Sequence, residues 1–422
     1  MAMNAPEEAD DGAPSSLSSE IDVLAAEVAK HRLFCVSAGN LAGKQVHGDY
    51  QALNETTGIM SPAQAWNALT VSACTDLVDV PNTHTPVAPQ GDLCPWSRTA
   101  VNWERKNKPP SKPDIVFEGG NQMIDAATSV VGVHRNLCLL TTSVDAAHPL
   151  TLTGQTSAAT AAVAGFCAQL QAEYPTLWPE TIRGLVVHAS EHTAAMRAKA
   201  VNAAVLNKSQ QSALLERYGY GRPDLQVAMQ NGEDALTLIM QGRLRPLRMN
   251  DKGTGIVLGF MKFHALPWPI EVLEELDETP AELRVTLSYF IEPNPGLALQ
   301  GQMDMYPSHG LDFDVMRPDE SQEQAIGRIN AAAPPRRKST AVSPDWEFGR
   351  LRGRGGLKHD RLRTTASDLA RMGGVSVYPR KGWWGRDLEK VEQQVSYSLI
   401  VSIRTPGEDI YTEIAADIPI EV

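Results

Sequence analysis

Residues 153–160 read Thr-Gly-Gln-Thr-Ser-Ala-Ala-Thr, and this stretch decides the fold. Small side chains continue behind it, so the sequence predicts a helix over residues 158–174 that packs closely against a sheet. Ser157 lies at the first turn of that helix, where free backbone N–H groups point at developing negative charge. The serine is therefore a candidate nucleophile. Taken alone, Thr156 and Ser157 are more simply explained as residues that cap a core helix.

Short apolar runs on the N-terminal side of this helix predict a parallel sheet. They end on polar or glycine-rich residues, as buried parallel strands do, and lie at residues 33–40, 66–73 and 114–118. A further strand is predicted at 136–143, and a proline-rich surface excursion at 75–113. Helices are predicted at 20–30, capped by Ser18 or Ser19, and at 179–190. Together these elements predict an α/β domain over residues 1–232.

The remaining residues, 233–422, follow a different pattern. Alternating β-branched and aromatic residues, as in the segments that begin at 255 and 282, predict an all-β, sandwich-like domain. A mobile loop is expected near 316–345. Basic residues gather between Arg350 and Arg363; a solvated loop is the simpler interpretation, and RNA contact is the alternative.

Composition limits the partners and the compartment. The chain has 38 lysines and arginines against 50 aspartates and glutamates, a net charge of −12, which argues against nucleic acid as a partner. Five widely spaced cysteines, without a CxxC pair, indicate free thiols in a reducing compartment. No apolar run is long enough for a membrane span and the first residues are no secretory signal, so we expect a cytoplasmic protein that does not bind membranes.

The order of the motifs resembles the second half of the subtilisin-like serine peptidases (subtilases, peptidase family S8). The matching segments are Val36-Ser37-Ala38-Gly39-Asn40, Lys112-Pro113-Asp114-Ile115-Val116, Gly119-Gly120, Thr156-Ser157, Tyr174-Pro175 and Pro179-Glu180-Thr181-Ile182-Arg183. The resemblance covers roughly residues 15–232 and implies a doubly wound, mostly parallel sheet. It is closest to an intracellular bacterial branch that has a similar Thr-Ser-Ala-Ala-Thr motif and a β-rich C-terminal extension.

The resemblance implies a serine endopeptidase that hydrolyses peptide bonds of a protein or peptide substrate. Ser157 matches the nucleophile, and Asn40 matches the side-chain donor of the oxyanion hole, with the Ser157 N–H as second donor. A hydroxyl attacks a peptide carbonyl only if it loses its proton and fixed donors meet the oxyanion. No organic cofactor is implied. Structural calcium is common in the family, but no acidic loop here has a spacing that identifies metal ligands.

Two departures from the family's pattern matter. Gln155 and Ala161 replace a usual glycine and proline, so the turn at Ser157 is expected to be shaped differently. The family's Asp-x-Gly and His-Gly-Thr motifs should precede Asn40 and are not found; Asp10, His31 and His47 do not match them. We therefore expect an N-terminally truncated peptidase that is inactive as this chain, with the aspartate and histidine supplied either by an upstream segment or by a second chain. The alternative is a non-catalytic binding or scaffold protein derived from a subtilase.

Overall fold

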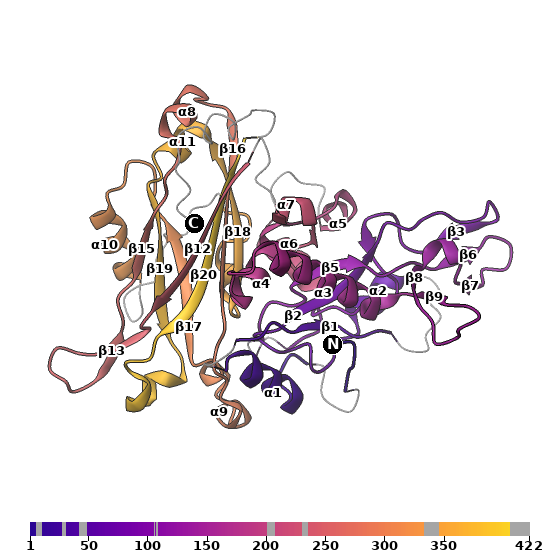
Figure 1. Cartoon of the computed structure of the whole chain (residues 1–422), viewed down its shortest axis with the longest axis horizontal. Helices are drawn as coiled ribbons and strands as arrows, with labels where there is room; N and C mark the ends of the chain where they lie inside the picture. Colours follow the sequence, from indigo (N-terminus) through magenta and orange to yellow (C-terminus); the bar gives the residue numbers. More distant parts are fainter. Residues whose placement is uncertain are drawn as a thin grey trace. The chain divides into compact units, whose positions relative to one another are not determined.

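The structure is a computed structural model and describes residues 1–5, 11–27, 31–41, 49–104, 106, 109–200, 207–229, 235–332 and 346–405. The chain divides into two compact units, Met1–Ala228 and Met229–Val422 (Figure 1). Within the described ranges, no helix combines the length and the apolar composition that crossing a membrane requires.

The first unit is built around a small sheet whose central strand is β2 (Leu69–Thr75). β1 (Cys35–Ser37) and β5 (Ile115–Glu118) pair with it in parallel, one on each side. β4 (Asp92–Leu93) pairs antiparallel with the last residues of β2. Every residue of β2 is buried, which is why its sequence is a continuous run of apolar and small side chains. The three predicted parallel strands are confirmed.

The helices of the first unit surround this sheet. They are α1 (Ser16–Ala25), α2 (Tyr50–Glu55), α3 (Gln155–Glu173), α4 (Pro179–His188), α5 (Ala194–Ala200), α6 (Lys208–Tyr218) and α7 (Leu225–Met229). α3 packs against β1, β2 and β5, and its small side chains allow the close approach that the sequence predicts. The cap of α1 is Ser15, whose hydroxyl accepts a hydrogen bond from the Ser18 N–H, so the prediction of Ser18 or Ser19 is wrong.

The predicted surface excursion at 75–113 is confirmed only in its first part: residues 76–90 are mostly exposed or half-buried, whereas most of residues 91–100 and 109–113 are buried. Besides β4 it contains β3 (His84–Pro86), which joins β6 (Met123–Asp125) and β7 (Val131–Gly132) in an antiparallel sheet. Asp92 is fully buried and accepts hydrogen bonds from the hydroxyls of Tyr50 at 2.6 Å and Tyr218 at 2.8 Å. Polar contacts therefore bury a segment that has few aliphatic residues.

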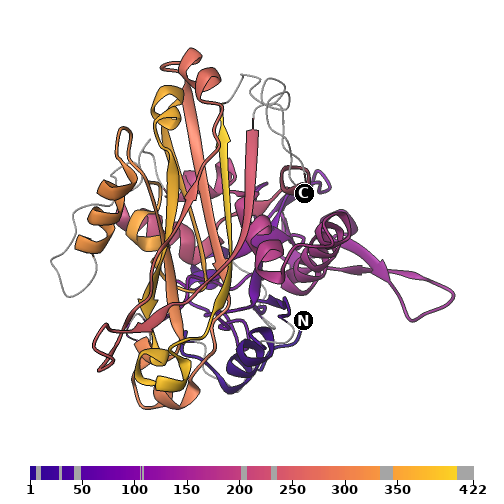
Figure 2. The same ribbon diagram turned by 60° about the vertical axis from the view of Figure 1, so that its left-hand side comes forward.

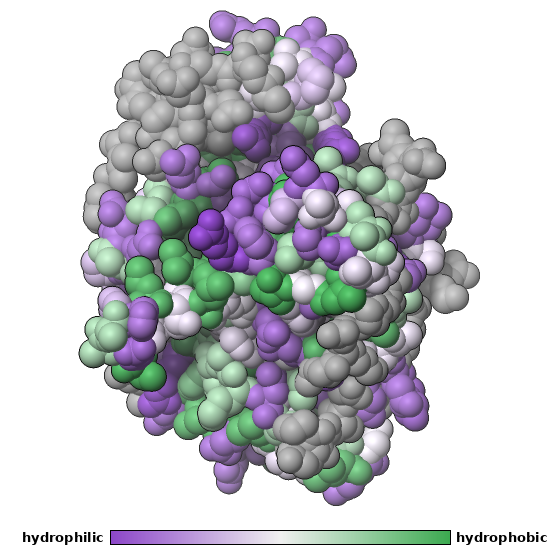
Figure 3. Space-filling model, turned by 90° about the vertical axis from the view of Figure 1, so that its right-hand side faces the viewer, coloured by the Kyte–Doolittle hydropathy of each residue, from purple (hydrophilic) through white to green (hydrophobic). Residues whose placement is uncertain are grey.

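The strand predicted at 136–143 forms, but outside the parallel sheet. A 3₁₀ turn, η2 (Arg135–Leu137), precedes β8 (Leu139–Thr142), which pairs antiparallel with β9 (Leu150–Thr153). Figure 2 shows this hairpin extending away from the rest of the unit, and it carries exposed Leu140, Leu150 and Leu152. Figure 3 views the molecule from the right-hand side of Figure 1 and shows apolar (green) side chains among polar (purple) ones on that face. A second short pair, β10 (Ser190–Glu191) and β11 (Arg222–Pro223), lies near the end of the unit.

The second unit contains two antiparallel sheets and a hairpin. The four-stranded sheet has the order β12 (Ala235–Leu244), β20 (Val395–Arg404), β16 (Pro280–Tyr289) and β18 (Leu357–Thr365). The three-stranded sheet has the order β15 (Lys262–Ala265), β19 (Gly374–Lys381) and β17 (His309–Val315), and the hairpin joins β13 (Leu247–Met249) to β14 (Ile256–Leu258). Short helices connect the strands: α8 (Ile270–Glu275), α9 (Pro295–Leu299), α10 (Gln322–Ala332), α11 (Ala366–Ala370), η3 (Met303–Met305), η4 (Gly349–Gly353), η5 (Trp383–Arg386) and η6 (Leu388–Lys390).

A buried ion pair, Lys358 with Asp312, joins the two sheets of the second unit, and further ion pairs lie beside it. The Lys358 ammonium on β18 and the Arg380 guanidinium on β19 both contact the Asp312 carboxylate on β17. Arg352 pairs with Asp360 at 2.9 Å. The interpretation of the basic cluster as a solvated loop is therefore wrong for Arg352, Lys358 and Arg361, which are buried in the folded unit and cannot contact RNA there. Arg354 and Arg363 of the same cluster are exposed.

The expected mobile loop near 316–345 also needs correction. Its first half contains α10, in which the Arg328 side chain binds Glu320 and Asp314 and the Ala325 and Ile329 side chains are buried. The second half, residues 333–345, lies outside the described residues.

Candidate active site

Asn40 follows β1, and hydrogen bonds of Asn40 itself and of the next residue fix its backbone. Its carbonyl oxygen accepts a hydrogen bond from Arg98 Nε at 2.9 Å, and the next residue, Leu41, donates its N–H to the Trp96 carbonyl at 3.0 Å. Asn40 and Ser97 also form an isolated antiparallel bridge. The backbone of Asn40 is therefore fixed by the segment that follows β4.

The Asn40 side chain is fixed as well, and in a defined orientation. Its Oδ1 accepts two hydrogen bonds from Thr156, one from the backbone N–H at 3.0 Å and one from the hydroxyl at 2.8 Å. A backbone N–H only donates, so the atom that faces Thr156 has to be the oxygen. The Nδ2 amide group then points away from Thr156, and no side chain or carbonyl of the described residues accepts its hydrogens. Asn40 is half-buried, so this donor is available.

Ser157 lies next to Thr156 in the first turn of α3 and is half-buried. Gly154 is the N-cap residue and provides no side-chain cap. The Ser157 N–H belongs to the first turn, in which backbone donors have no partner within the helix. The structure thus brings two predicted site residues together through Thr156: Asn40 binds Thr156, and Ser157 follows it.

The turn that leads into Ser157 has an unusual backbone. Gln155 has a φ of 66°, in the left-handed region that favours glycine, and its N–H donates to the Gly119 carbonyl at 2.6 Å. A Cβ atom at Gly119 would lie 2.5 Å from the Ala73 Cβ and 3.0 Å from the Gln155 carbonyl oxygen. The turn is therefore pressed against the end of β5, and Gln155 adopts the conformation that a glycine would adopt.

A model of the subtilase family matches residues 1–221. The chain belongs to the subtilase family. Among solved structures, the self-cleaved protease domain of PatA is 16% identical over 54% of this chain and 60% of its own, with a TM-score of 0.30. MycP1 with its N-terminal propeptide removed is 16% identical over 54% of this chain and 58% of its own, with a TM-score of 0.28. The subtilase chain thus spans 60% or less of these two structures, and no curated protein matches it.

Of the six described histidines of the subtilase unit, five contact groups other than Ser157, and the sixth, His188, is buried on α4. His31 Nδ1 lies 2.5 Å from Glu180 Oε1, His148 Nδ1 lies 2.9 Å from Asp145, and His192 Nε2 lies 2.9 Å from the Gly219 carbonyl oxygen. His84 contacts Asp125, and His134 caps η2. Asp10 and His47, which the sequence also raised, lie outside the described residues. Within the described part of the chain, no hydrogen bond joins the Ser157 hydroxyl to an imidazole.

The described residues of the subtilase chain hold no group of three or more histidine, cysteine, aspartate or glutamate side chains suited to a metal ion. The described ranges therefore offer no candidate ligands for the structural calcium that is common in the family.

Sequence reasoning missed two residues that shape the site. Thr156 orients the Asn40 amide through both its N–H and its hydroxyl, and Arg98 fixes the Asn40 carbonyl. The role of Thr156 could have been suspected from the sequence, because this threonine lies directly beside the candidate nucleophile. No signal in the sequence pointed to Arg98, because its contact with Asn40 spans 58 residues.

Proposed function

We propose that this subtilase chain supplies the nucleophile and the oxyanion donors of a serine endopeptidase that acts on proteins or peptides. Ser157 is the nucleophile, Asn40 is the side-chain donor, and the Ser157 N–H is the second donor. The observation that supports this proposal is the orientation of the Asn40 amide by Thr156. A donor that is fixed before the substrate arrives stabilises the transition state without reorganising.

The chemistry follows from these positions. A base removes the Ser157 hydroxyl proton while Oγ bonds to the scissile carbonyl carbon, and the carbonyl oxygen becomes an oxyanion that accepts hydrogen bonds from Asn40 Nδ2 and the Ser157 N–H. When the carbon–nitrogen bond breaks, the base returns its proton to the leaving amine. Water then attacks the acyl-serine in the same manner and releases the acid.

We propose further that the base is a histidine outside residues 1–422, on an upstream segment or on a second chain that also supplies the aspartate, and that this chain by itself is nearly inactive. Five described histidines of the first unit support this idea, because their ring contacts are with Glu180, Asp145, Asp125 and neighbouring backbone or hydroxyl groups. Loss of the histidine lowers turnover by about 10⁶, a figure measured in subtilisin.

Labelling with a fluorophosphonate tests the proposal. The isolated chain should not label, and the chain combined with a polypeptide that carries the Asp-x-Gly and His-Gly-Thr motifs should label at Ser157. Ser157→Ala is the matched control and should remove the label. Labelling of the isolated chain at Ser157 would show that one of its own histidines is the base, and no labelling of the combined chains would favour the non-catalytic scaffold.

The oxyanion role has its own test in the labelled, active form. Asn40→Ala should lower turnover by about 10²–10³ with little change in KM, a magnitude known from the asparagine of subtilisin. A loss of the same size that is confined to KM would reject the role of Asn40 as a transition-state donor.

For the second unit we propose a β-sandwich-like extension. Its two sheets contact each other through Asp312, Lys358 and the ring pair Tyr289–His309, whose centroids are 5.5 Å apart. We also propose a cytoplasmic location without an organic cofactor, which suits the five free cysteines.

A further inference from the structure

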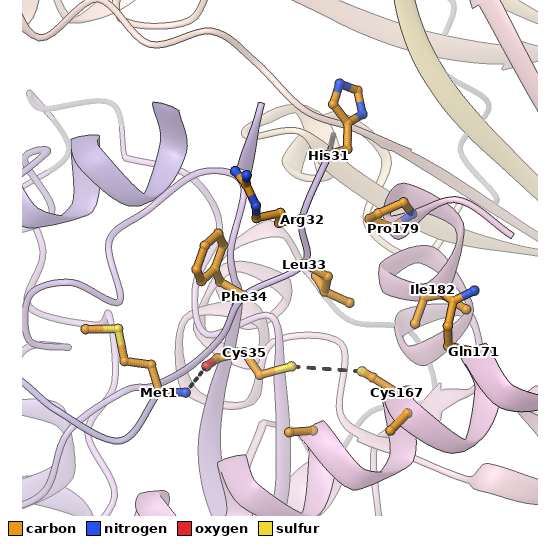
Figure 4. A pocket seen from close by; sticks show the side chains of 12 residues that line it. Met1, His31, Arg32, Leu33, Phe34, Cys35, Cys167, Gln171, Pro179 and Ile182 are labelled. Carbon is orange, nitrogen blue, oxygen red and sulfur yellow. Dashed lines mark hydrogen bonds between the residues drawn. The ribbon is translucent and has the colours of Figure 1, made fainter. Parts of the chain in front are cut away.

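Two cysteines face each other in the first unit, one on each of the elements that lead to the candidate active site. Cys35 begins β1, the strand before Asn40, and Cys167 lies on α3, the helix that carries Ser157. Their sulfur atoms are 3.9 Å apart, and Figure 4 shows the two side chains pointing at one another. Both cysteines are free.

The two sulfur atoms are reachable from a cavity of about 420 Å³. Cys35 and Cys167 both line it, together with Leu33, Phe34 and Ile182 (Figure 4). Cys35 is 9% exposed and Cys167 is 8% exposed, whereas Cys74 and Cys94 are 1% and 0% exposed. A small reagent can therefore approach the facing pair more readily than the two cysteines inside the sheet.

The environments of the two thiols differ in a way that suits a reactive pair. The hydrogen bond with Cys167 lowers the pKa of Cys35, although burial acts in the other direction. The same hydrogen bond, together with burial, raises the pKa of Cys167 well above its ordinary value. Cys35 is therefore the more acidic thiol of the pair and the one that loses its proton first.

We propose that Cys35 and Cys167 form a dithiol modification site that hydrogen peroxide converts into a disulfide. The Cys35 thiolate attacks one peroxide oxygen, the O–O bond breaks, and the leaving hydroxide takes a proton to become water, which leaves Cys35 as a sulfenic acid. Cys167 loses its proton, its sulfur attacks the Cys35 sulfur, and the sulfenic oxygen departs with that proton as a second water. Two thiols are oxidised and one peroxide is reduced.

The structure supports the second step as well as the first. The sulfur atoms need to move from 3.9 Å to about 2.0 Å for a disulfide to form. Among the described residues, Cys167 is the cysteine whose sulfur forms a hydrogen bond with that of Cys35, which makes it the resolving partner. The resulting bond would join β1 to α3 directly.

The experiment uses the reduced full chain and hydrogen peroxide. Free thiols are counted after denaturation, and peptide mapping by mass spectrometry locates the products. We expect the count to fall from five to three and the cross-linked peptides to contain Cys35 and Cys167. Cys35 should react about tenfold faster than Cys138, whose pKa is raised by burial.

Two variants separate the roles. Cys167→Ser should stop at the sulfenic acid of Cys35, which dimedone traps, and Cys35→Ser should prevent loss of the Cys167 thiol. Cys138→Ser is the matched control and should behave like the wild type. The wild type in urea should lose its preference for this pair, a measurement that needs no variant. Absence of the Cys35–Cys167 peptide in the oxidised folded chain, or oxidation of Cys138 as fast as Cys35, would overturn the proposal.

Discussion

The buried ion pair at the start of β5 makes the most demanding prediction. Lys112 Nζ lies 2.6 Å from Asp114 Oδ2 and donates to the Ala68 carbonyl at 2.8 Å. Asp114 Oδ2 also accepts the Thr70 N–H at 2.6 Å, and this bond ties β5 to β2. Lys112 is 2% exposed and Asp114 is 3% exposed, so water cannot replace either partner.

We expect Lys112→Met to lower the free energy of unfolding of the first unit by about 3–5 kcal/mol, because it leaves a buried carboxylate without its cation. Coulomb attraction at the observed 2.6 Å is about 6 kcal/mol with an effective dielectric constant of 20. Desolvation of both groups offsets part of it. The double variant Lys112→Met, Asp114→Asn should be more stable than Lys112→Met, because the asparagine is neutral and still accepts the Thr70 N–H.

Hydrogen exchange measured by mass spectrometry suits this test, because peptides from β2 and β5 report on the first unit alone. Asp114→Asn completes the double-mutant cycle and gives the coupling energy. Two results would refute the reasoning: a loss below about 1 kcal/mol for Lys112→Met, which would mean that other groups compensate Asp114, or a double variant less stable than both single variants.

Further expectations concern the turn before Ser157 and the core of the second unit. Gln155→Gly should stabilise the chain by about 0.5–1 kcal/mol in urea unfolding, since it removes left-handed strain, and Gln155→Ala should give no such gain. Gly119→Ala should destabilise it by about 1–3 kcal/mol, because the new Cβ meets that of Ala73; unchanged stability would contradict the close packing. Burial lowers the pKa of His309 to about 3, whereas a histidine in the unfolded chain titrates near 6.5. Below pH 6.5 the unfolded chain therefore takes up a proton at His309 that the folded chain does not. The free energy of unfolding should fall by about 1.4 kcal/mol per pH unit from this cause as the pH drops from 6.5 toward 3. His309→Phe should flatten this slope in unfolding curves recorded at pH 7, 6 and 5, and an unchanged slope would exclude the histidine as its source.

Local pattern was sufficient for the strands of the parallel sheet, because β2 is buried on both faces and its sequence is apolar throughout. The start of α3 was placed three residues late, since Gln155 gives no hint of its left-handed backbone. The buried part of the excursion at 75–113 was misjudged for a different reason. Its burial depends on hydrogen bonds to Asp92 from Tyr50 and Tyr218, and Tyr218 lies 126 residues away in sequence.

The same limit explains the errors in the second unit and bears on the site residues, whose roles stay predictions. Lys358 can be buried because its ammonium group pairs with the Asp312 carboxylate, 46 positions away in sequence. The basic residues around Lys358 alone gave no sign of this partner and therefore suggested an exposed loop. Ser157 was a candidate from its helix position alone, but Asn40 was joined to it only through the resemblance to the subtilases, because 116 residues separate Asn40 from Thr156. No periodicity in the sequence could have paired them.

The ion pair between the two sheets of the second unit has a consequence for how the sheets align. Asp312 and Lys358 come from different sheets, and each of these buried charges is tolerable inside the unit only when the other is in place, whereas the Arg380 side chain is half exposed. A pair of sheets that met in a shifted alignment would enclose unmatched charges, a far less stable arrangement than leaving them in water. The Lys358–Asp312 pair therefore favours the one alignment of the two sheets in which both charges are matched.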